Sequence, residues 1–245
     1  MSLFSLVFSL FDPAVVLVHT GLTALAADLH PVLGSADVAV ALVLVTVIVR
    51  ACLLPLAVAV LRAERARQAL APELARLRSR HSADPARLVR ELQAAHRAAG
   101  ISPFAGILPA LAQGPALFVI YRLCKLPLIG GGPNAVLTAN LLGAPLAAHL
   151  PGLVLTTGLL GTPTLLAGLL VSAMLLVAYA SARQQVRRLR SAAIGEIAPV
   201  QLLLARVLPF GTVAAVAVVP FAVSLYLLTS ATWMLAERAL LPRMF

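Results

Sequence analysis

The chain has 245 residues, of which 61% are hydrophobic and only 11% are charged. This composition excludes a soluble globular domain and predicts a membrane protein with several spans. The formal net charge of +10 does not indicate nucleic-acid binding, because aromatic residues make up only 5% of the chain and do not interleave with the basic ones.

The placement of the basic residues predicts the topology. Residues 62–97 contain nine arginines and residues 183–206 contain five, whereas residues 1–49 and 126–182 contain no Lys or Arg. The positive-inside rule therefore places the two basic segments in the cytoplasm. Arg122 and Lys125 break this pattern, and we interpret them as snorkelling to the opposite interface, with a functional role as the alternative.

The first two elements are an interfacial helix and a span with a charge in its middle. Residues 1–35 are apolar, lack Lys and Arg and predict an extracytoplasmic interfacial helix. Residues 36–61 predict the first span, in which Pro55 would kink the helix and free backbone groups toward a cavity. A guanidinium at mid-bilayer costs about 2.5 to 3.5 kcal/mol on insertion scales. Arg50, near the centre of this span, is therefore the first candidate functional residue.

Residues 62–100 predict a cytoplasmic hairpin of two helices. Leucines recur at helical spacing on both sides of a break at residues 82–85. Asp84 is the expected N-cap of the second helix and Pro85 its first residue. A solvated loop that only fixes the orientation of the chain is the alternative.

The remaining chain predicts four more spans. Residues 103–125, with Gln113 among their polar positions, predict the second span. An uncharged, glycine-rich and proline-rich extracytoplasmic loop follows, irregular in structure, with the option of a short interfacial piece near residues 140–150. The third span ends at Arg183. The predicted segments are 103–125 (second span), 126–161 (loop), 162–182 (third span) and 183–201 (cytoplasmic loop).

The last apolar stretch, residues 207–236, fits one long tilted span or two short spans bent near Pro220. Two spans, at 202–219 and 221–238, leave a short tail at 239–245 in the cytoplasm, as its basic residues require. The predicted fold is therefore an all-α polytopic membrane protein with five spans, the N-terminus outside and the C-terminus in the cytoplasm.

Catalytic chemistry is not predicted. The chain contains no HExxH, GxSxG, P-loop or dinucleotide fingerprint, and its histidines and carboxylates lie outside the spans or at their ends. We expect no enzyme, no catalytic residue, no metal and no cofactor. An anion pathway through Arg50 stays open, whereas a cation-coupled transporter lacks its carboxylate. Cys52 and Cys124 are expected to be small buried hydrophobes.

Several blocks of sequence resemble the YidC-type membrane protein insertases, bacterial relatives of the mitochondrial and chloroplast insertases. The similarity covers about residues 11–240 and is weaker near the end, where Ala231 replaces a common Asn and Glu237 a frequent Gln. In order, the blocks are Val45-Thr46-Val47-Ile48-Val49-Arg50, Leu53-Leu54-Pro55-Leu56, Gln68-Ala69-Leu70-Ala71-Pro72-Glu73-Leu74, Asp84-Pro85, Gly100-Ile101-Ser102-Pro103-Phe104-Ala105-Gly106 and Leu108-Pro109-Ala110-Leu111-Ala112-Gln113-Gly114-Pro115.

The resemblance implies a five-span core around a hydrophilic groove that opens to the cytoplasm and to lipid. It makes Arg50 the positive charge of this groove, with Thr46 one turn before it and Gln113 from the second span. A bond from the Thr46 hydroxyl to its own helix, and an interhelical bond from Gln113, are the alternatives. Spacing along the last span also places Tyr226, Ser230 and Trp233 at the groove, with an interfacial anchor as the alternative for Trp233.

The implied function is a membrane protein insertase of the bacterial cytoplasmic (inner) membrane that releases substrate segments laterally into the bilayer without hydrolysis. Its implied partners are newly made membrane proteins and membrane lipid, with the ribosome and the Sec translocon as further candidates and no specific nucleic acid. The alternatives are a chaperone or assembly factor that acts only beside a translocon and, less favoured, an anion-conducting transporter.

Overall fold

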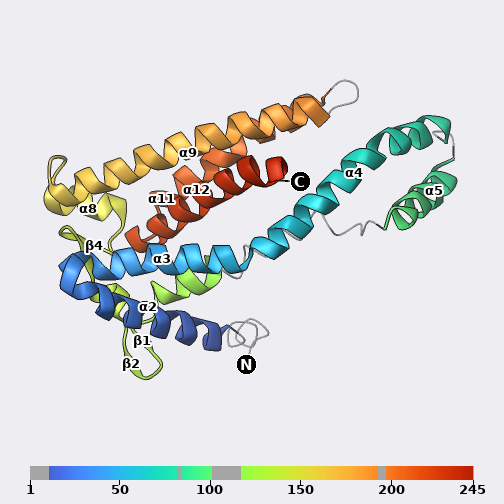
Figure 1. Ribbon diagram of the computed structural model, residues 1–245. Helices are drawn as coiled ribbons and strands as arrows, with labels where there is room; N and C mark the ends of the chain where they lie inside the picture. The colour runs from blue at the N-terminus through green and yellow to red at the C-terminus, as the bar shows by residue number, and fades with distance from the viewer. Residues whose placement is uncertain (1–10, 82–83, 101–116, 193–196, 245) are drawn as a thin grey trace.

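The structure, a computed structural model, describes residues 11–81, 84–100, 117–192 and 197–244. Most of these residues are helical. They form a bundle and a helical arm that extends away from it (Figure 1). Within the described residues, three helical stretches are long and apolar enough to cross a membrane: Asp12–Cys52, Thr162–Ser191 and Pro199–Val216. The prediction of an all-α membrane protein is confirmed at this level, and the five-span count stays a prediction.

Helix α2 (Asp12–Leu33) packs against helix α3 (Asp37–Cys52). Its buried residues, Val15, Leu22 and Ala26, recur at helical spacing and form one stripe. The chain reverses at Gly34, whose φ of 53° favours glycine, and continues through η1 (Gly34–Ala36). An interfacial location for α2 stays a prediction, but its packing on α3 explains why α2 is apolar.

The first predicted span is interrupted close to Pro55. Helix α3 ends at Cys52 and helix α4 (Leu54–Arg80) begins two residues later. Proline has no N–H, so Pro55 cannot donate to the Ala51 carbonyl four residues before it. The predicted kink is therefore confirmed. The predicted end of the first span at residue 61 stays a prediction. No helix ends there, because α4 runs on without a break into the basic segment.

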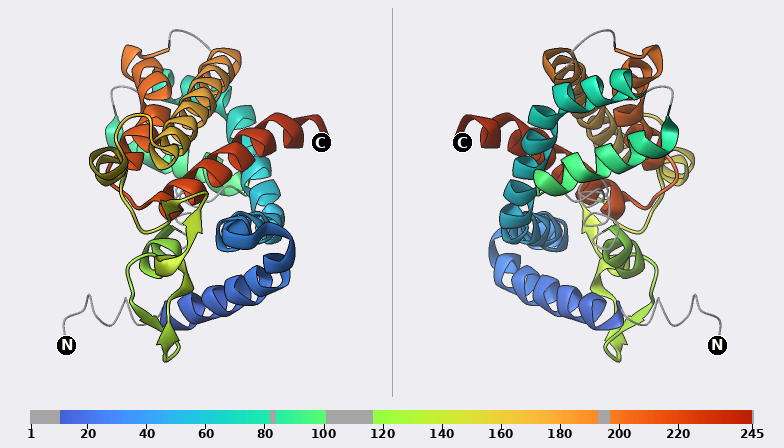
Figure 2. Two further views of the ribbon diagram at one scale, coloured as in Figure 1. Left: turned by 90° about the vertical axis from the view of Figure 1, so that its left-hand side faces the viewer. Right: turned by 90° about the vertical axis from the view of Figure 1, so that its right-hand side faces the viewer.

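Helix α5 (Pro85–Ala98) begins where the sequence predicts. The Asp84 carboxylate accepts a hydrogen bond of 3.0 Å from the Arg87 N–H and caps the helix. Helices α4 and α5 contact each other, and Leu70 and Ala95 are buried. This arm points away from the bundle (Figure 1). Figure 2 looks along the molecule from its two ends, so the arm overlaps the bundle in both views.

The segment at residues 126–161 is more ordered than predicted. It holds two short antiparallel hairpins and two helices, and residues 140–145 form the second hairpin. An interfacial location for residues 140–150 stays a prediction. Asn134 is buried and holds the segment: its amide donates to the carbonyls of Leu123 and, at 2.8 Å, Leu126. The elements are β1 (Leu128–Ile129), β2 (Gly132–Pro133), α7 (Ala135–Thr138), β3 (Asn140–Leu141), β4 (Ala144–Pro145) and α8 (Leu150–Thr157).

The last third of the chain contains the helices that complete the bundle. Two of them exceed the predicted spans: α9 continues past Arg183, and α12 continues past residue 238. The chain breaks before α12 at Pro220, as the two-helix alternative predicts. The elements are α9 (Thr162–Ala192), α10 (Pro199–Val207), η3 (Leu208–Phe210), α11 (Gly211–Val216) and α12 (Phe221–Met244).

Backbone and side-chain donors join α12 to its neighbours at both ends. Its first N–H groups, of Phe221 and Ala222, donate to the carbonyls of Ala148 (2.8 Å) and Leu146 (2.9 Å) in the ordered segment. Toward the other end, the Arg188 guanidinium of α9 donates to the Arg238 carbonyl. That carbonyl has no helical donor because residue 242 is proline. Helix α12 is thereby held along α9 and also packs on α3.

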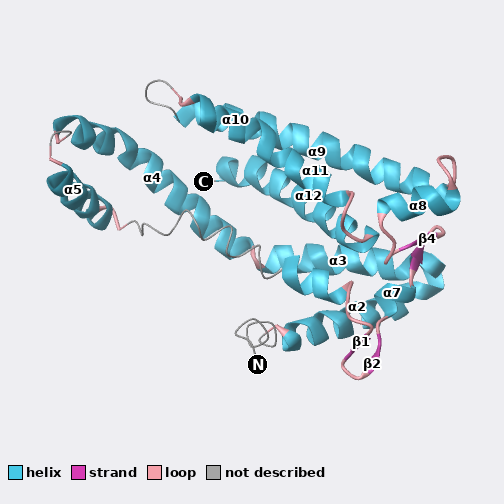
Figure 3. Ribbon diagram, turned by 180° about the vertical axis from the view of Figure 1, so that it is seen from behind, coloured by secondary structure: helices cyan, strands magenta, loops and turns pink. Residues whose placement is uncertain are grey.

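The main core lies at the end of the bundle opposite the arm. Its fully buried side chains come from α2, α3, residues 117–124, residues 126–161, α9 and α12, and include Leu22, Leu42, Leu123, Leu146 and Met174. The strands lie at this end as well (Figure 3). The same end thus combines the apolar core with the uncharged part of the sequence.

Two side-chain environments can be compared with the predictions. The Arg122 guanidinium lies 2.8 Å from the Asp12 carboxylate and 5.9 Å from the centre of the Phe118 ring, and its position at the membrane interface stays a prediction. Cys124 is buried as expected, but Cys52 is exposed. The prediction for Cys52 is therefore wrong. The break in the helix at residue 53 explains the error, because hydropathy does not show which side of a broken helix faces its neighbours.

Candidate functional site

Arg50 lies in the last turn of α3, directly before the break, and is half-buried. The described residues offer it no ion-pair partner. The C-terminal end of α3 carries partial negative charge, and the adjacent Ala51 carbonyl lacks its helical donor because of Pro55. These dipoles stabilise a guanidinium without neutralising it, so Arg50 can still attract an anionic group.

Thr46 lies one turn before Arg50 and is only 3% exposed. Its hydroxyl donates a hydrogen bond of 2.7 Å to the Leu42 carbonyl of its own helix. The alternative interpretation from the sequence is therefore confirmed. The hydroxyl oxygen keeps acceptor capacity, but its proton is already used.

Helix α12 supplies two buried polar side chains where it packs in the bundle. Tyr226 and Ser230 are each 5% exposed and lie four residues apart, on one face of the helix. The Ser230 hydroxyl is buried and has no hydrogen-bond partner among the described residues. A buried hydroxyl without a hydrogen bond lowers the free energy of unfolding by about 1 to 3 kcal/mol. A purely structural role therefore does not explain a serine at position 230.

Trp233 is half-buried, and its indole Nε1 donates to the Glu237 carboxylate at 3.0 Å. This bond joins two residues one turn apart on the same helix. Sequence reasoning missed the role of Glu237, although the spacing of four residues is the signal that could have found it. The predicted partner from the second span, Gln113, lies outside the described residues.

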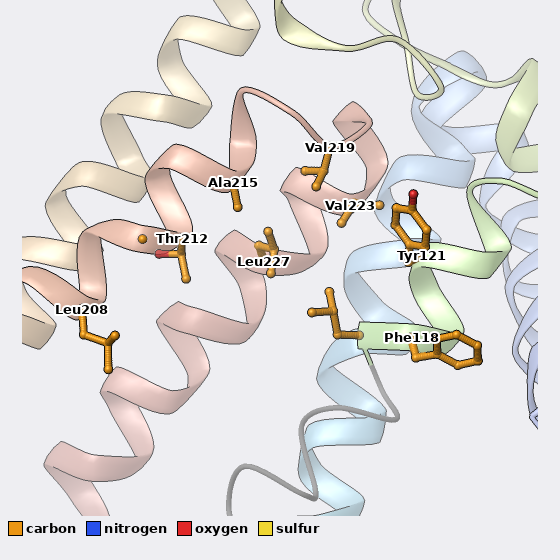
Figure 4. A pocket seen from close by; sticks show the side chains of 10 residues that line it. Phe118, Tyr121, Leu208, Thr212, Ala215, Val219, Val223 and Leu227 are labelled. Carbon is orange, nitrogen blue, oxygen red and sulfur yellow. The ribbon is translucent and has the colours of Figure 1, made fainter. Parts of the chain in front are cut away.

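A pocket of about 530 Å³ lies between the helical residues 117–123, η3 with α11, and α12 (Figure 4). Among the described residues, Arg50, Thr46, Tyr226, Ser230 and Trp233 do not line it. Apolar side chains dominate the lining, so the sequence offered no polar pattern by which to predict it. The lining residues are Leu117, Phe118, Tyr121, Leu208, Gly211, Thr212, Ala215, Val219, Val223 and Leu227.

The pocket and the buried polar pair lie on neighbouring faces of α12. Val223 and Leu227 face the pocket, while Tyr226 and Ser230 follow three residues after each of them. Helix α12 thus separates an apolar pocket from buried hydroxyl groups, and α3 brings a basic residue to the same bundle. These features define a helical membrane protein with a partly polar interior.

Comparison with known proteins identifies the family. A family model described as 60Kd inner membrane protein matches residues 29–245. The chain therefore belongs to this family, and the resemblance to the YidC-type proteins that its sequence shows is confirmed.

The relatives include a membrane protein insertase YidC of Streptomyces avermitilis, which is 34% identical over 82 residues, 34% of this chain and 19% of the relative. Membrane protein insertase YidC 1 of Halalkalibacterium halodurans is 39% identical over 85 residues, 33% of each chain. Membrane protein insertase MisCA of Bacillus subtilis is 36% identical over 84 residues, 33% of this chain and 32% of the relative. The matched region spans a third or less of each of these relatives.

Proposed function

We propose that the protein inserts newly made membrane proteins into the bilayer of a bacterial inner membrane, without covalent chemistry. The observation that carries this proposal is the family match over residues 29–245. In this proposal the N-terminus lies outside, and the arm formed by α4 and α5 lies in the cytoplasm with its arginines. The arm is placed to meet substrates first.

Arg50 is the attracting group in this mechanism. A carboxylate about 4 Å from a guanidinium gains about 1 kcal/mol in bulk water and about 4 kcal/mol at the effective dielectric of a protein surface. Part of this gain is lost to desolvation, so the pairing is temporary. A substrate segment with an acidic residue can therefore enter a polar groove near Arg50 and leave again.

The buried hydroxyl of Ser230 and the phenol of Tyr226 support the same step. They supply hydrogen-bonding groups that meet backbone atoms of a passing segment or hold water in the groove. Thr46 contributes as a hydrogen-bond acceptor only, since its hydroxyl already donates to the Leu42 carbonyl. We assign Gln113 and Trp233 to the groove as well, and Trp233 would have to exchange its bond to Glu237 to take part.

The apolar pocket suits the next step, in which the substrate helix moves toward lipid. Its walls come from three separate helical segments, which can cover one side of an apolar helix. Transfer of apolar surface from water yields about 25 cal/mol per Å², so burial in the pocket and then in lipid drives the substrate forward. Lateral release past α12 completes the cycle.

The proposed function is tested with purified protein in liposomes and a small single-span substrate. We expect insertion with this protein alone and little insertion with Arg50→Ala. Insertion that requires an added translocon would instead identify a chaperone or assembly factor. An Arg50-dependent anion flux without insertion would identify a transporter. Binding to ribosomes is tested separately by cosedimentation, with the arginines of α5 replaced by glutamine as the control.

A further inference from the structure

The connection between α8 and α9 carries three strongly exposed leucines. Leu155, near the end of α8, is 86% exposed, and Leu159 and Leu160, between the helices, are 74% and 86% exposed. Nearby Leu153 is buried in the core, so one side of α8 packs against the bundle. We call residues 155–161 the leucine corner.

The leucine corner is a rigid structure. The hydroxyls of Thr157 and Thr164 lie 3.0 Å apart and join its two sides. Gly158 has a φ of +71°, which favours glycine. A Cβ on Gly161 would lie 2.5 Å from the Thr157 carbonyl oxygen, so only glycine fits there. The fold therefore holds Leu159 and Leu160 outward, although burial of a leucine side chain is favourable.

Lipid is the expected surrounding of the leucine corner, because the apolar surface of α9 continues into it. Exposed leucines follow along one face of α9 at residues 165, 169 and 176, and α9 is one of the candidate membrane spans. No charged residue occurs from residue 126 to residue 182. The apolar surface therefore runs without interruption from the span into the corner.

The length of α9 sets the depth of the corner. Its uncharged part, residues 162–182, is about 31 Å long at a rise of about 1.5 Å per residue, close to the hydrocarbon thickness of about 30 Å. With Arg183 at one interface, Thr162 reaches the other. The corner lies at the end of the molecule opposite the arm, as Figure 1 shows for the connection between α8 and α9.

From these observations we infer that the leucine corner dips into the bilayer surface at the end opposite the arm. Leu155, Leu159 and Leu160 insert among the lipid acyl chains near the head groups and anchor the outer end of α9. This anchor fixes the depth and tilt of the helix against which α12 packs. It does not depend on the proposed insertion activity, because it requires only lipid.

The test uses tryptophan fluorescence in phosphatidylcholine liposomes. The chain has one Trp, so Trp233→Phe gives a dark background into which Leu160→Trp or Leu159→Trp is placed. Bromine on the lipid chains, near the head group or near the chain end, quenches tryptophans at the corresponding depth, and acrylamide quenches those in water. Leu169→Trp, on the exposed face of α9, is the matched deep control, and Val89→Trp, exposed on the charged helix α5, is the water control.

We expect the corner tryptophans to emit at shorter wavelength than Val89→Trp, to lose intensity mainly with lipids brominated near the head group, and to resist acrylamide. Leu169→Trp should lose more with lipids brominated near the chain end. Quenching of both corner tryptophans by acrylamide, as for Val89→Trp, would overturn the inference. Resistance to both quenchers would overturn it too, because a second copy of the chain would then cover the corner. No substrate is present, so failure here leaves the proposed function untouched.

Discussion

Ser230 and Ser224 are buried on the same helix but differ in one respect. The Ser224 hydroxyl has a partner, the Pro220 carbonyl at 3.3 Å, whereas the Ser230 hydroxyl has none among the described residues. A buried polar group that has no partner among the described residues calls for an explanation by another role. The proposed groove gives Ser230 such a role and gives none to Ser224.

This contrast predicts opposite effects of two matched substitutions. Ser230→Ala should raise the free energy of unfolding by about 1 kcal/mol, because an unpaired hydroxyl is removed, and should slow insertion. Ser224→Ala should leave insertion unchanged and not raise stability. Thermal unfolding in detergent and insertion into liposomes measure the two properties. A loss of stability in Ser230→Ala would show that its hydroxyl is bonded in the folded protein.

At this scale the sequence predicts what depends on composition and local spacing. Arg50 stands out because a charge in an apolar run is costly, and the bond from Thr46 to its own helix follows from helical geometry. The pairing of Arg122 with Asp12 could not be predicted, because more than a hundred residues separate the two along the chain. The apolar pocket was missed because its lining carries no polar signal.

At the scale of the elements, two side-chain contacts join the start of α2 to the helical residues 117–123. The Asp12 carboxylate lies 2.8 Å from the Arg122 guanidinium, and the Phe11 and Phe118 rings meet edge to face with 5.1 Å between their centres. A charged pair and an aromatic pair thus act at one place. Together they hold α2 in position over the end of the bundle.

A double-mutant cycle should detect the interaction between Asp12 and Arg122. Asp12→Asn and Arg122→Gln should each lower the melting temperature, and their coupling should be about 1 kcal/mol or less, since the Asp12 side chain is 49% exposed. Added salt should weaken the coupling. Lys125, which lies over the Tyr121 ring, provides the control: Lys125→Gln should show no coupling to Asp12→Asn. Equal coupling for both residues would mean that Asp12 responds to net charge and not to a specific partner.

Two glycines of the α9 region give a second prediction about elements. Gly161 has no room for a Cβ, whereas nothing lies within 4 Å of a Cβ on Gly168. Gly161→Ala should lower the free energy of unfolding by about 1 to 3 kcal/mol. Gly168→Ala should be neutral or raise it by up to about 1 kcal/mol, because alanine favours a helix. Equal melting temperatures for the two variants would show that the corner is not rigid.

The helices themselves and the start of α5 could be predicted, but the ends of α4 and α9 could not. Asp84 and Pro85 start α5 as expected because capping is a local interaction. Helices α4 and α9 run past the predicted boundaries because the sequence signal used there was the change from apolar to charged residues. That change marks a membrane surface, and a hydrogen-bonded helix crosses it without interruption.

At the scale of the whole molecule, apolar core and charge lie at opposite ends. The core and the uncharged residues 126–182 gather at one end, and the basic arm of α4 and α5 projects from the other (Figure 1). The break between α3 and α4, with Arg50 beside it, lies between these two regions. In the proposed mechanism, the charge that would attract a substrate thus lies between the arm that would receive it and the apolar bundle that would release it.

The central claim is that the charge of Arg50 drives substrate entry, and complementation in cells depleted of their own insertase tests it most directly. Wild type, Arg50→Lys and Arg50→Ala are compared at equal expression and membrane insertion. We predict rescue by wild type and Arg50→Lys, because both keep a positive charge at the helix break, and failure of Arg50→Ala. Rescue by Arg50→Ala as complete as that by wild type would contradict the account.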